Sequence, residues 1–338
     1  MVYAVYTDAI GNTLGTFRTV DGGDTWTQVS NAETVSYGWW FGQIRVDPTD
    51  WRRVWVPWLN LYRSTTSGNS WQYRSDNMHV DHHALWIDPS DPSRMIAGND
   101  GGVYRSTLGG DVWVKASGAF PATQFYTVEV DASEPQRLYG GTQDNGTNRT
   151  LTGNLNDWQP IFGGDGHYVL VDPIDNDYVY VEFQYGNLYR SQDGGNTFVF
   201  AQPPVARANW SAPMAFDPQN PRTVYFGGER IFRTRNRMLT WDPISPDLSN
   251  GPGSGSLVFG TVTTIGVSPA ASSRLWAGTD DGKVWTTADA GGTWTDRSAG
   301  LPDRWVTRIT PHPTEPLAAV ATLSGFRWGE NTAQVYRT

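Results

Sequence analysis

Two short turn motifs recur along the whole chain, and no other feature constrains its fold as strongly. The first motif is an alternating apolar stretch that closes in Asp-Pro or a close variant. Its copies lie 41 to 51 residues apart, at Asp47-Pro48, Asp88-Pro89, Asp131-Ala132, Asp172-Pro173, Asp217-Pro218, Ser268-Pro269 and His312-Pro313. A period of this length is typical of solenoids, propellers and other arrays of repeated units.

The second motif is a Gly-rich turn that leads to Trp or Phe. Its clearest copies end at Trp26, Phe198 and Trp294, and looser copies end at Trp71, Trp113, Trp158 and Trp241. Gly supplies the positive φ that a tight turn needs, and an Asp carboxylate accepts hydrogen bonds from its N–H groups. We expect the aromatic residue to anchor the following strand against the next unit.

Between these motifs each unit is predicted to form four short β-strands. In the unit that starts at Asp165 the segments are His167–Val171, Tyr178–Glu182, Gly186–Arg190 and Thr197–Ala201. They are rich in β-branched and aromatic residues, and Gly, Asn, Asp and Pro separate them. Four strands in a repeat of 40 to 50 residues indicate a β-propeller blade.

The repeats predict an all-β protein that forms one domain over residues 1–338. Six units are complete, the first lacks an inner strand and the last lacks its Gly-rich turn. We therefore expect a seven-bladed β-propeller whose ring closes near the two termini. An eight-bladed ring, or a piece of a longer two-propeller protein, remains an alternative.

The Ser/Thr-x-Asp-x-Gly-x-Thr-Trp pattern resembles the Asp-box (BNR) repeat, and the resemblance covers essentially the whole chain. Such boxes occur in sialidases, sortilin-type receptors, family 74 xyloglucanases and a photosystem II assembly factor. A narrower resemblance is to bacterial BNR-repeat glycosyl hydrolase-like proteins, through 81–86, 98–102, 140–146 and 163–166. It implies a propeller and carries over no catalytic residue. A sialidase is disfavoured because its Arg triad is missing.

Composition excludes several classes of function. The chain has 25 Lys and Arg against 34 Asp and Glu, and its net charge of −9 argues against nucleic-acid binding. With no Cys, disulfides, thiolate metal sites and a Cys nucleophile are excluded. Neither a transmembrane segment nor a signal peptide is visible in the sequence. The resemblance nevertheless favours an extracytoplasmic location, periplasmic or secreted.

Propeller topology sorts the loops onto two faces, and one face collects the unusual polar residues. The starts of first strands and the second-to-third loops of three consecutive blades meet there. They supply Asp81, His82, His83, Asn99 and Asp100, then Tyr126, Gln143, Asp144 and Asn145, then Asp165, His167, Glu182 and Gln184. Counting back from the Asp-Pro turns puts His83, Tyr126 and His167 at one level, which predicts a functional sector at the channel mouth.

Each of these residues also has a structural interpretation. Asn-Asp-Gly-Gly and Asp-Asn-Gly are typical of tight hairpin turns. Adjacent His residues point to opposite faces of a strand, so at most one of His82 and His83 should face the channel. We therefore expect His82 to be the one that can lie between blades.

Three chemistries suit the predicted sector. Paired carboxylates could act on a glycosidic bond, His and a carboxylate could bind a divalent metal, or His and Tyr could catalyse β-elimination on a uronate. The catalytic candidates are Asp81, His83, Asp100, Asp144, Asp165, His167 and Glu182. No compact His spacing supports a metal, so no metal ligand is assigned and no cofactor is expected with certainty.

Exposed aromatic residues complete the functional hypothesis. Trp39, Trp40, Trp210 and Trp305 lie in connections that enter first strands, where they could stack on sugar rings or fill grooves between blades. The other substrate-binding candidates are His82, Asn99, Tyr126, Gln143, Asn145 and Gln184. The favoured function is a carbohydrate-active, glycoside hydrolase-like propeller acting on a poly- or oligosaccharide. The alternative is a non-catalytic scaffold or assembly subunit that binds a protein partner, so enzymatic activity stays open.

Overall fold

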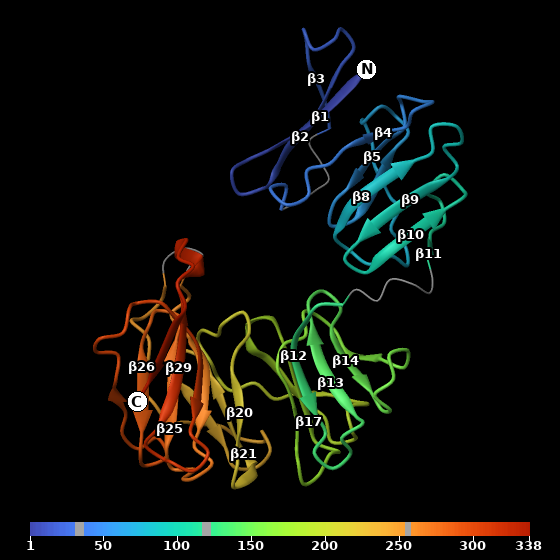
Figure 1. Ribbon diagram of the computed structural model, residues 1–338. Coiled ribbons are helices and arrows are strands. Elements are labelled where there is room, and N and C mark those ends of the chain that lie inside the picture. Colours follow the sequence, from blue (N-terminus) through green and yellow to red (C-terminus); the bar gives the residue numbers. More distant parts are fainter. Residues whose placement is uncertain (31–36, 117–122, 254–257) are drawn as a thin grey trace. The chain divides into compact units, whose positions relative to one another are not determined.

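The computed structural model describes residues 1–30, 37–116, 123–253 and 258–338. The chain divides into two compact units, Met1–Ala122 (unit 1) and Thr123–Thr338 (unit 2). Figure 1 shows that both units consist of short antiparallel sheets, each made from consecutive segments of the chain. The two units are described separately below.

Unit 1 contains three sheets. The first has three strands, β1 (Val2–Thr7), β2 (Thr13–Thr19) and β3 (Thr27–Ser30). The second has β4 (Arg45–Val46), β5 (Val54–Pro57), β6 (Leu61–Ser64) and β7 (Gln72–Tyr73). The third has β8 (His82–Ile87), β9 (Met95–Asn99), β10 (Gly102–Ser106) and β11 (Val114–Lys115).

Unit 2 contains five sheets, and the first three have four strands each. The first consists of β12 (Phe125–Val130), β13 (Leu138–Thr142), β14 (Thr147–Thr150) and β15 (Gln159–Phe162). The second consists of β16 (Val169–Val171), β17 (Val179–Phe183), β18 (Asn187–Arg190) and β19 (Val199–Phe200). The third consists of β20 (Met214–Asp217), β21 (Asn220–Gly227), β22 (Ile231–Thr234) and β23 (Asp242–Pro243). A 3₁₀ turn, η1 (Gln184–Gly186), joins β17 to β18.

The last two sheets of unit 2 differ in size. One has four strands, β24 (Val262–Val267), β25 (Leu275–Thr279), β26 (Val284–Thr287) and β27 (Thr295–Asp296). The other has three, β28 (Trp305–Pro311), β29 (Ala319–Ser324) and β30 (Gln334–Arg337), with the 3₁₀ turn η2 (Phe326–Trp328) before β30.

The protein belongs to the all-β class and is built from β-propeller blades, as the repeat predicted. Each four-stranded blade is a meander in which consecutive strands pair antiparallel. The seven-bladed ring over residues 1–338 stays a prediction. In the described part of the chain, no helix has the length and apolar character needed to cross a membrane.

The Gly-rich turns have the geometry that the sequence suggested. In the clearest copies the Asp carboxylate accepts the backbone N–H of a Thr four residues later, at 3.0 Å for Asp21, 2.8 Å for Asp193 and 2.8 Å for Asp289. These hydrogen bonds lower the pKa of the carboxyl group, to about 2 for Asp289. The Asp side chains therefore close the turns that lead to the last strands of their sheets, β3, β19 and β27.

The Asp-Pro turns use their carboxylates in a similar way. The side chain of Asp47 accepts the N–H of Thr49 at 2.8 Å, and that of Asp217 accepts the N–H of Gln219 at 2.9 Å. Such Asx turns satisfy backbone donors that the end of a strand leaves unpaired. Both sets of turns therefore belong to the scaffold.

Adjacent blades pack face to face through apolar side chains. Tyr180 and Leu188 of one blade share a buried cluster with Met214 and Phe226 of the next. Several aromatic residues that end Gly-rich turns join this packing, namely Trp113, Phe198, Trp241 and Trp294, whereas Trp26 is exposed. The indole N–H of Trp241, for example, donates to the carbonyl of Ala201 in the preceding blade at 2.8 Å. These interfaces fix the positions of the loops at the strand ends.

Candidate functional site

A β-bulge at the start of β8 separates the two adjacent histidines. In the pairing of β8 with β9, His82 lies opposite Asn99 and Ala84 lies opposite Gly98, so that His83 is the extra residue. The side chain of His82 has no exposed surface, whereas His83 stays partly exposed. Of the two, only His83 is exposed to solvent, and the expectation that only one faces a channel stays a prediction.

Burial keeps the His82 imidazole neutral. Desolvation, together with the nearby rings of His79 and His83, lowers the pKa of His82 to about 4. Its two ring nitrogens have no hydrogen-bond partner among the described residues. His82 was a candidate for substrate binding, and the structure places it in the packed interior of unit 1.

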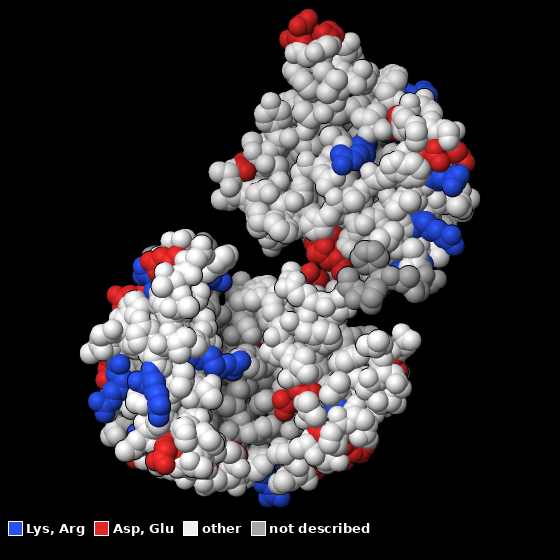
Figure 2. All heavy atoms as spheres, viewed as in Figure 1, with Lys and Arg blue, Asp and Glu red and all other residues white. Residues whose placement is uncertain are grey.

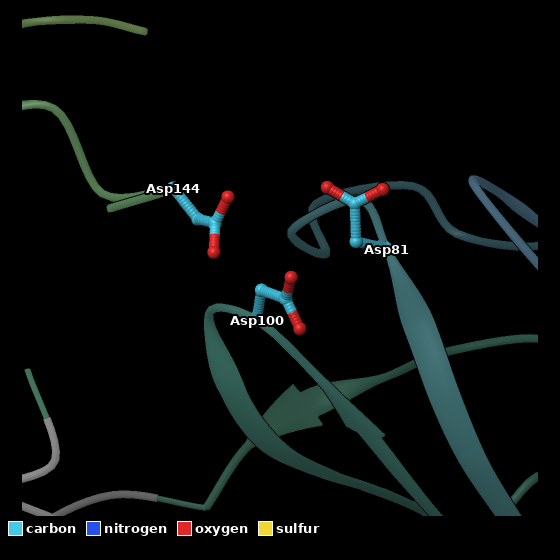
Figure 3. A group of neighbouring side chains, drawn as sticks. All are labelled: Asp81, Asp100 and Asp144. Carbon is cyan, nitrogen blue, oxygen red and sulfur yellow. The ribbon is translucent and has the colours of Figure 1, made fainter. Parts of the chain in front are cut away.

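Asp81, His83 and Asp100 come together at one end of the β8–β11 blade. Asp81 directly precedes β8, and Asp100 lies in the turn between β9 and β10 (Figure 3). The Nε2 atom of His83 is 3.1 Å from an Oδ atom of Asp100, and carboxylate oxygens of Asp81 and Asp100 lie within 4.8 Å of each other. Asp144, also labelled in Figure 3, belongs to unit 2 and is described with it.

Local backbone contacts hold this group in place. Asp81 has a positive φ of 64°, and its N–H donates to the carbonyl of Leu59 at 2.9 Å. The side-chain amide of Gln43 donates to the carbonyl of His83. The side chain of Asn99 donates to the carbonyl of His79 at 2.8 Å, so Asn99 supports the loop before β8. A left-handed Asp is sparsely populated and occurs where surrounding contacts fix it.

An aromatic ledge, formed by Tyr37, Trp39 and Trp40, adjoins His83. The rings of Trp39 and Trp40 are 5.9 Å apart, and Trp40 meets His83 edge to face at 5.9 Å. Trp39 is 64% exposed and Trp40 is 63% exposed. Contiguous apolar surface of this kind marks a binding site more often than isolated exposed residues do. The sequence identified both Trp residues but missed Tyr37, which is 6.1 Å from Trp39.

The predicted polar residues of unit 2 also lie together, but they bond mainly to one another. The carboxylate of Asp165 accepts the backbone N–H of Asp144 at 2.6 Å and the side-chain amide of Gln184. Gln184 in return accepts the N–H of Asp165 at 3.1 Å. Gln143 and Asn145 flank Asp144 in the same turn, and the N–H of Asn145 donates to the carbonyl of Gln143 at 2.8 Å. This network connects loops of neighbouring blades.

His167 is enclosed by aromatic rings. It stacks on Tyr126 at 4.5 Å and meets Trp210 edge to face at 5.7 Å. The side chain has no exposed surface, and desolvation lowers its pKa to about 4. Burial also raises the pKa of the Tyr126 hydroxyl, which a hydrogen bond with Trp210 opposes. Trp210 therefore fills the space between blades, one of the two roles expected for it.

Glu182 lies near the end of β17, against the segment that enters the β20–β23 blade. One carboxylate oxygen accepts the N–H of Ala212 at 2.8 Å, and the other has no partner among the described residues. Complete burial raises the pKa of Glu182 well above its ordinary value. Burial therefore favours the neutral, protonated form of this side chain.

A hollow of about 400 Å³ lies on the loop side of unit 2. Its lining includes Tyr185, Gln202, Arg207 and Phe259. None of these was a candidate from the sequence, although Tyr185, with its φ of 63°, directly follows Gln184. Trp305 lies near Phe259, at 6.5 Å between rings, and the guanidinium of Arg327 lies 4.4 Å from the ring centre of Trp305.

Surface charge bears on the kind of ligand. In the view of Figure 2 the Lys and Arg side chains are interrupted by acidic and uncharged surface and form no continuous basic patch on either unit. The Asp81–Asp100 pair adds local negative charge in unit 1. Two close carboxylates repel a polyanion. Divalent metals also bind imidazole nitrogens and carboxylate oxygens, so a metal site at His83 and these carboxylates stays a prediction.

Comparison with known proteins gives structural neighbours but no family assignment. No family model and no curated protein matches the chain. A GH74 enzyme of Niastella koreensis is 17% identical with a TM-score of 0.32, over 97% of this chain and 60% of its own. The GH74 xyloglucanase of Xanthomonas campestris is 16% identical with a TM-score of 0.32, over 99% and 63%. YCF48 of Cyanidioschyzon merolae is 12% identical with a TM-score of 0.43, over 87% and 93%.

The chain therefore spans about three fifths of the length of these two GH74 enzymes. Identities and TM-scores this low say nothing about activity. The function has to be argued from the site itself.

Proposed function

We propose that the protein is carbohydrate-active and that its saccharide site is the group Asp81, His83, Asp100, Trp39 and Trp40 of unit 1. One observation carries the proposal: a close pair of carboxylates lies beside a ledge of exposed indole rings, joined to it through His83. Sugar rings offer an apolar face to an aromatic ring and hydroxyl groups to carboxylates. A few convergent polar groups beside an aromatic surface are typical of ligand sites.

The reaction proposed for the pair is hydrolysis of a glycosidic bond. Retaining glycosidases use two carboxyl groups about 5–5.5 Å apart, one as nucleophile and one as general acid and base. Oxygens of Asp81 and Asp100 within 4.8 Å of each other are compatible with that separation. His83, whose Nε2 contacts Asp100, would orient this carboxylate. The negative charge of the pair favours a neutral saccharide over a polyuronate.

The same proposal includes a family and a location. Membership of the Asp-box glycosyl hydrolase-like proteins is supported by the turn geometry around Asp21, Asp193 and Asp289. Action on a polysaccharide would place the protein outside the cytoplasm.

The first test is binding of a panel of neutral and acidic oligosaccharides, xyloglucan fragments included, by isothermal titration calorimetry. Trp39→Ala and Trp40→Ala should each weaken binding of the recognised sugar by tenfold or more, because each removes a stacking surface. Trp51→Ala is the matched control, since Trp51 is also an exposed Trp of unit 1 but follows an Asp-Pro turn. Equal loss in the control, or no loss in either ledge variant, would refute the site.

The second test is turnover of the sugar that binds. Asp81→Asn and Asp100→Asn should each lower kcat by about 10²–10⁴-fold while the sugar still binds. The control is Asp76→Asn, which removes an exposed carboxyl from the loop before β8. Rescue of one variant by azide would identify the carboxylate that the anion replaces. Full activity in both variants would remove the pair from the mechanism, and absence of any saccharide binding would favour the non-catalytic alternative.

A further inference from the structure

The hollow of about 400 Å³ in unit 2 is separate from the residues proposed to bind saccharide in unit 1. Three parts of unit 2 line it, namely the turn η1 between β17 and β18, the segment between β19 and β20, and Phe259 before β24. Ligand pockets in proteins have volumes of about 300–1,000 Å³. The hollow therefore has room for a small ligand.

The turn η1 contributes a tyrosine in a costly backbone conformation. Tyr185 has a φ of 63° and a ψ of 33°, and it is 50% exposed. The preceding blade has Asp144, with a φ of 62°, at the same point, since each is the second residue after its strand. Asp tolerates left-handed backbone, whereas a bulky aromatic residue rarely adopts it.

Tertiary contacts hold Tyr185 in this conformation. Its N–H donates to the carbonyl of Trp210 at 3.1 Å, and the rings of the two residues meet edge to face at 5.1 Å. Backbone strain of this kind persists where surrounding contacts fix it, and it clusters at active sites and ligand-binding turns. The exposed ring of Tyr185 is therefore a departure from the repeat that costs stability and forms one side of a hollow.

The other parts of the lining are fixed before any ligand binds. The backbone N–H groups of Ala206 and Arg207 both donate to Oε2 of the buried Glu229, at 3.1 Å and 3.2 Å. The N–H of Phe259 donates to the carboxylate of Asp280 at 2.6 Å. A preformed lining lowers the entropy that binding costs, because the loops are already ordered.

The lining combines aromatic rings with uncharged polar groups. Arg207 is the one charged residue among the described residues that line the hollow, and it pairs with Asp247 at 2.5 Å. Within the described part of the chain, the side-chain amide of Gln202 and the hydroxyl of Tyr185 have no hydrogen-bond partner. Each of these groups can both donate and accept. The hollow therefore suits a neutral ligand that carries hydroxyl groups beside an apolar face.

From these observations we propose that the hollow is a second saccharide site, which binds a neutral oligosaccharide and does not cleave it. The ring of Tyr185 stacks on the apolar face of a sugar unit, and the amide of Gln202 binds its hydroxyl groups. Among the described lining residues there is no carboxyl group, so the hollow has no acid and base for hydrolysis. The inference shares its ligand class with the proposed function, but it rests on none of the residues of the unit 1 site.

The test measures saccharide binding after the unit 1 site has been disabled. Cellohexaose, maltohexaose and mannohexaose are titrated by isothermal titration calorimetry into the double variant Trp39→Ala/Trp40→Ala. At least one of them should still bind, with a Kd of about 1 mM or tighter. Adding Tyr185→Asn to this variant should weaken that binding at least tenfold, and adding Gln202→Ala should weaken it at least threefold.

Matched variants separate loss of the ligand site from loss of the fold. Asn tolerates left-handed backbone, so Tyr185→Asn should leave the Tm unchanged or raise it while binding is lost. The control is Tyr73→Asn, which replaces an exposed Tyr of the outer strand β7 and should leave binding unchanged.

The outcomes also separate the two saccharide proposals. If the wild type binds a sugar and the double variant binds none, the second site is refuted and the unit 1 site stands. Undiminished binding after Tyr185→Asn, or no binding of any of the three sugars by the wild type, would likewise overturn the second site. Binding that Tyr185→Asn abolishes and the double variant keeps in full would support the second site and refute the one in unit 1.

Discussion

Replacing Glu182 by Gln should stabilise unit 2 at neutral pH. The Glu182 side chain is completely buried between two blades, and desolvation raises its pKa well above 4.5. The folded protein therefore keeps the proton at a pH where the unfolded chain has released it. Gln has nearly the same shape, can accept the N–H of Ala212 through its carbonyl oxygen, and has no proton to lose.

The sign and size of the effect follow from proton linkage. Above pH 4.5 the unfolded wild type binds fewer protons than the folded form, so its free energy of unfolding falls as pH rises, until the folded-state pKa is reached. The slope is about 1.4 kcal/mol per pH unit for one group. For each pH unit between 4.5 and the folded-state pKa, the wild type should therefore lose about 1.4 kcal/mol relative to Glu182→Gln. For a unit of this size that corresponds to a relative shift in Tm of about 3–6 °C per pH unit.

The assay is thermal unfolding followed by circular dichroism at pH 5, 6 and 7. The Tm difference between Glu182→Gln and the wild type should grow steadily with pH. Glu315→Gln is the control, because it removes a carboxyl from an exposed side chain, and its curve should run parallel to the wild type. Parallel curves for Glu182→Gln as well would refute the reasoning, since they would show that Glu182 ionises in the folded protein as it does in water.

Three further predictions follow from the packing. His167→Phe should abolish an acid-induced loss of stability. The pKa of His167 is about 4 in the folded protein and 6.5 in the unfolded chain, so the wild type loses about 3 kcal/mol of its free energy of unfolding as pH falls from 6.5 to 4. Urea unfolding at pH 4.5 and 7 measures this loss, and an unchanged pH dependence in the variant would mean that the ring is accessible to solvent. Trp294→Ala should lower the free energy of unfolding by about 3–5 kcal/mol, because it leaves a cavity at the blade interface and removes the hydrogen bond to the carbonyl of Ile244. A loss under 1 kcal/mol in urea unfolding would show that this Trp does not hold the two blades together. Gly141→Ala should destabilise by about 1–3 kcal/mol or more, because its Cβ would lie 2.0 Å from the carbonyl oxygen of His167, whereas Gly163→Ala, with nothing within 4 Å, should leave the Tm nearly unchanged.

The sequence predicts this fold well because the repeated turns are specified by residues that are neighbours in the sequence. A turn that needs an Asp at one position and Gly two or three residues later specifies its own geometry, so Asp21, Asp193 and Asp289 behave as expected. The alternation of apolar and polar residues likewise predicts the strands of each blade. Such features depend on neighbours in the sequence and not on distant packing.

Burial of the candidate site residues was less predictable. Whether Glu182 or His167 is accessible depends on residues distant in the chain, Ala212 for Glu182 and Tyr126 and Trp210 for His167. Asp165 could not be distinguished from a catalytic acid by spacing alone, yet its carboxylate binds the turn at Asp144. These contacts join residues far apart in the chain, and the repeat pattern does not encode them.

The repeat also supplies an internal comparison for the proposed site. Asp280 follows β25 as Asp100 follows β9, and each comes directly after the residue that faces a bulge in the first strand. Asp280 is buried and accepts the N–H of Thr261 at 2.9 Å and of Phe259 at 2.6 Å, so at this position it closes the loop before β24. In the β8 blade the place of Thr261 is taken by Asp81.

A second carboxylate at that position changes what Asp100 can do. The hydroxyl of Thr261 donates to Asp280 at 3.2 Å, but an ionised Asp81 has no hydrogen to donate to Asp100 and repels it. The Thr261–Asp280 arrangement closes its loop without such repulsion. In the β8 blade the left-handed backbone of Asp81, beside the exposed aromatic ledge, adds strain as well. Departures from a repeat that cost stability are expected where a protein binds or reacts with something. The departure from the repeat therefore selects Asp81 and Asp100 over the turn carboxylates. It predicts that Asp81→Asn, which keeps a side chain that tolerates the left-handed backbone and removes the repulsion, raises the Tm of the protein while lowering turnover. A lower Tm would show that the pair serves the fold.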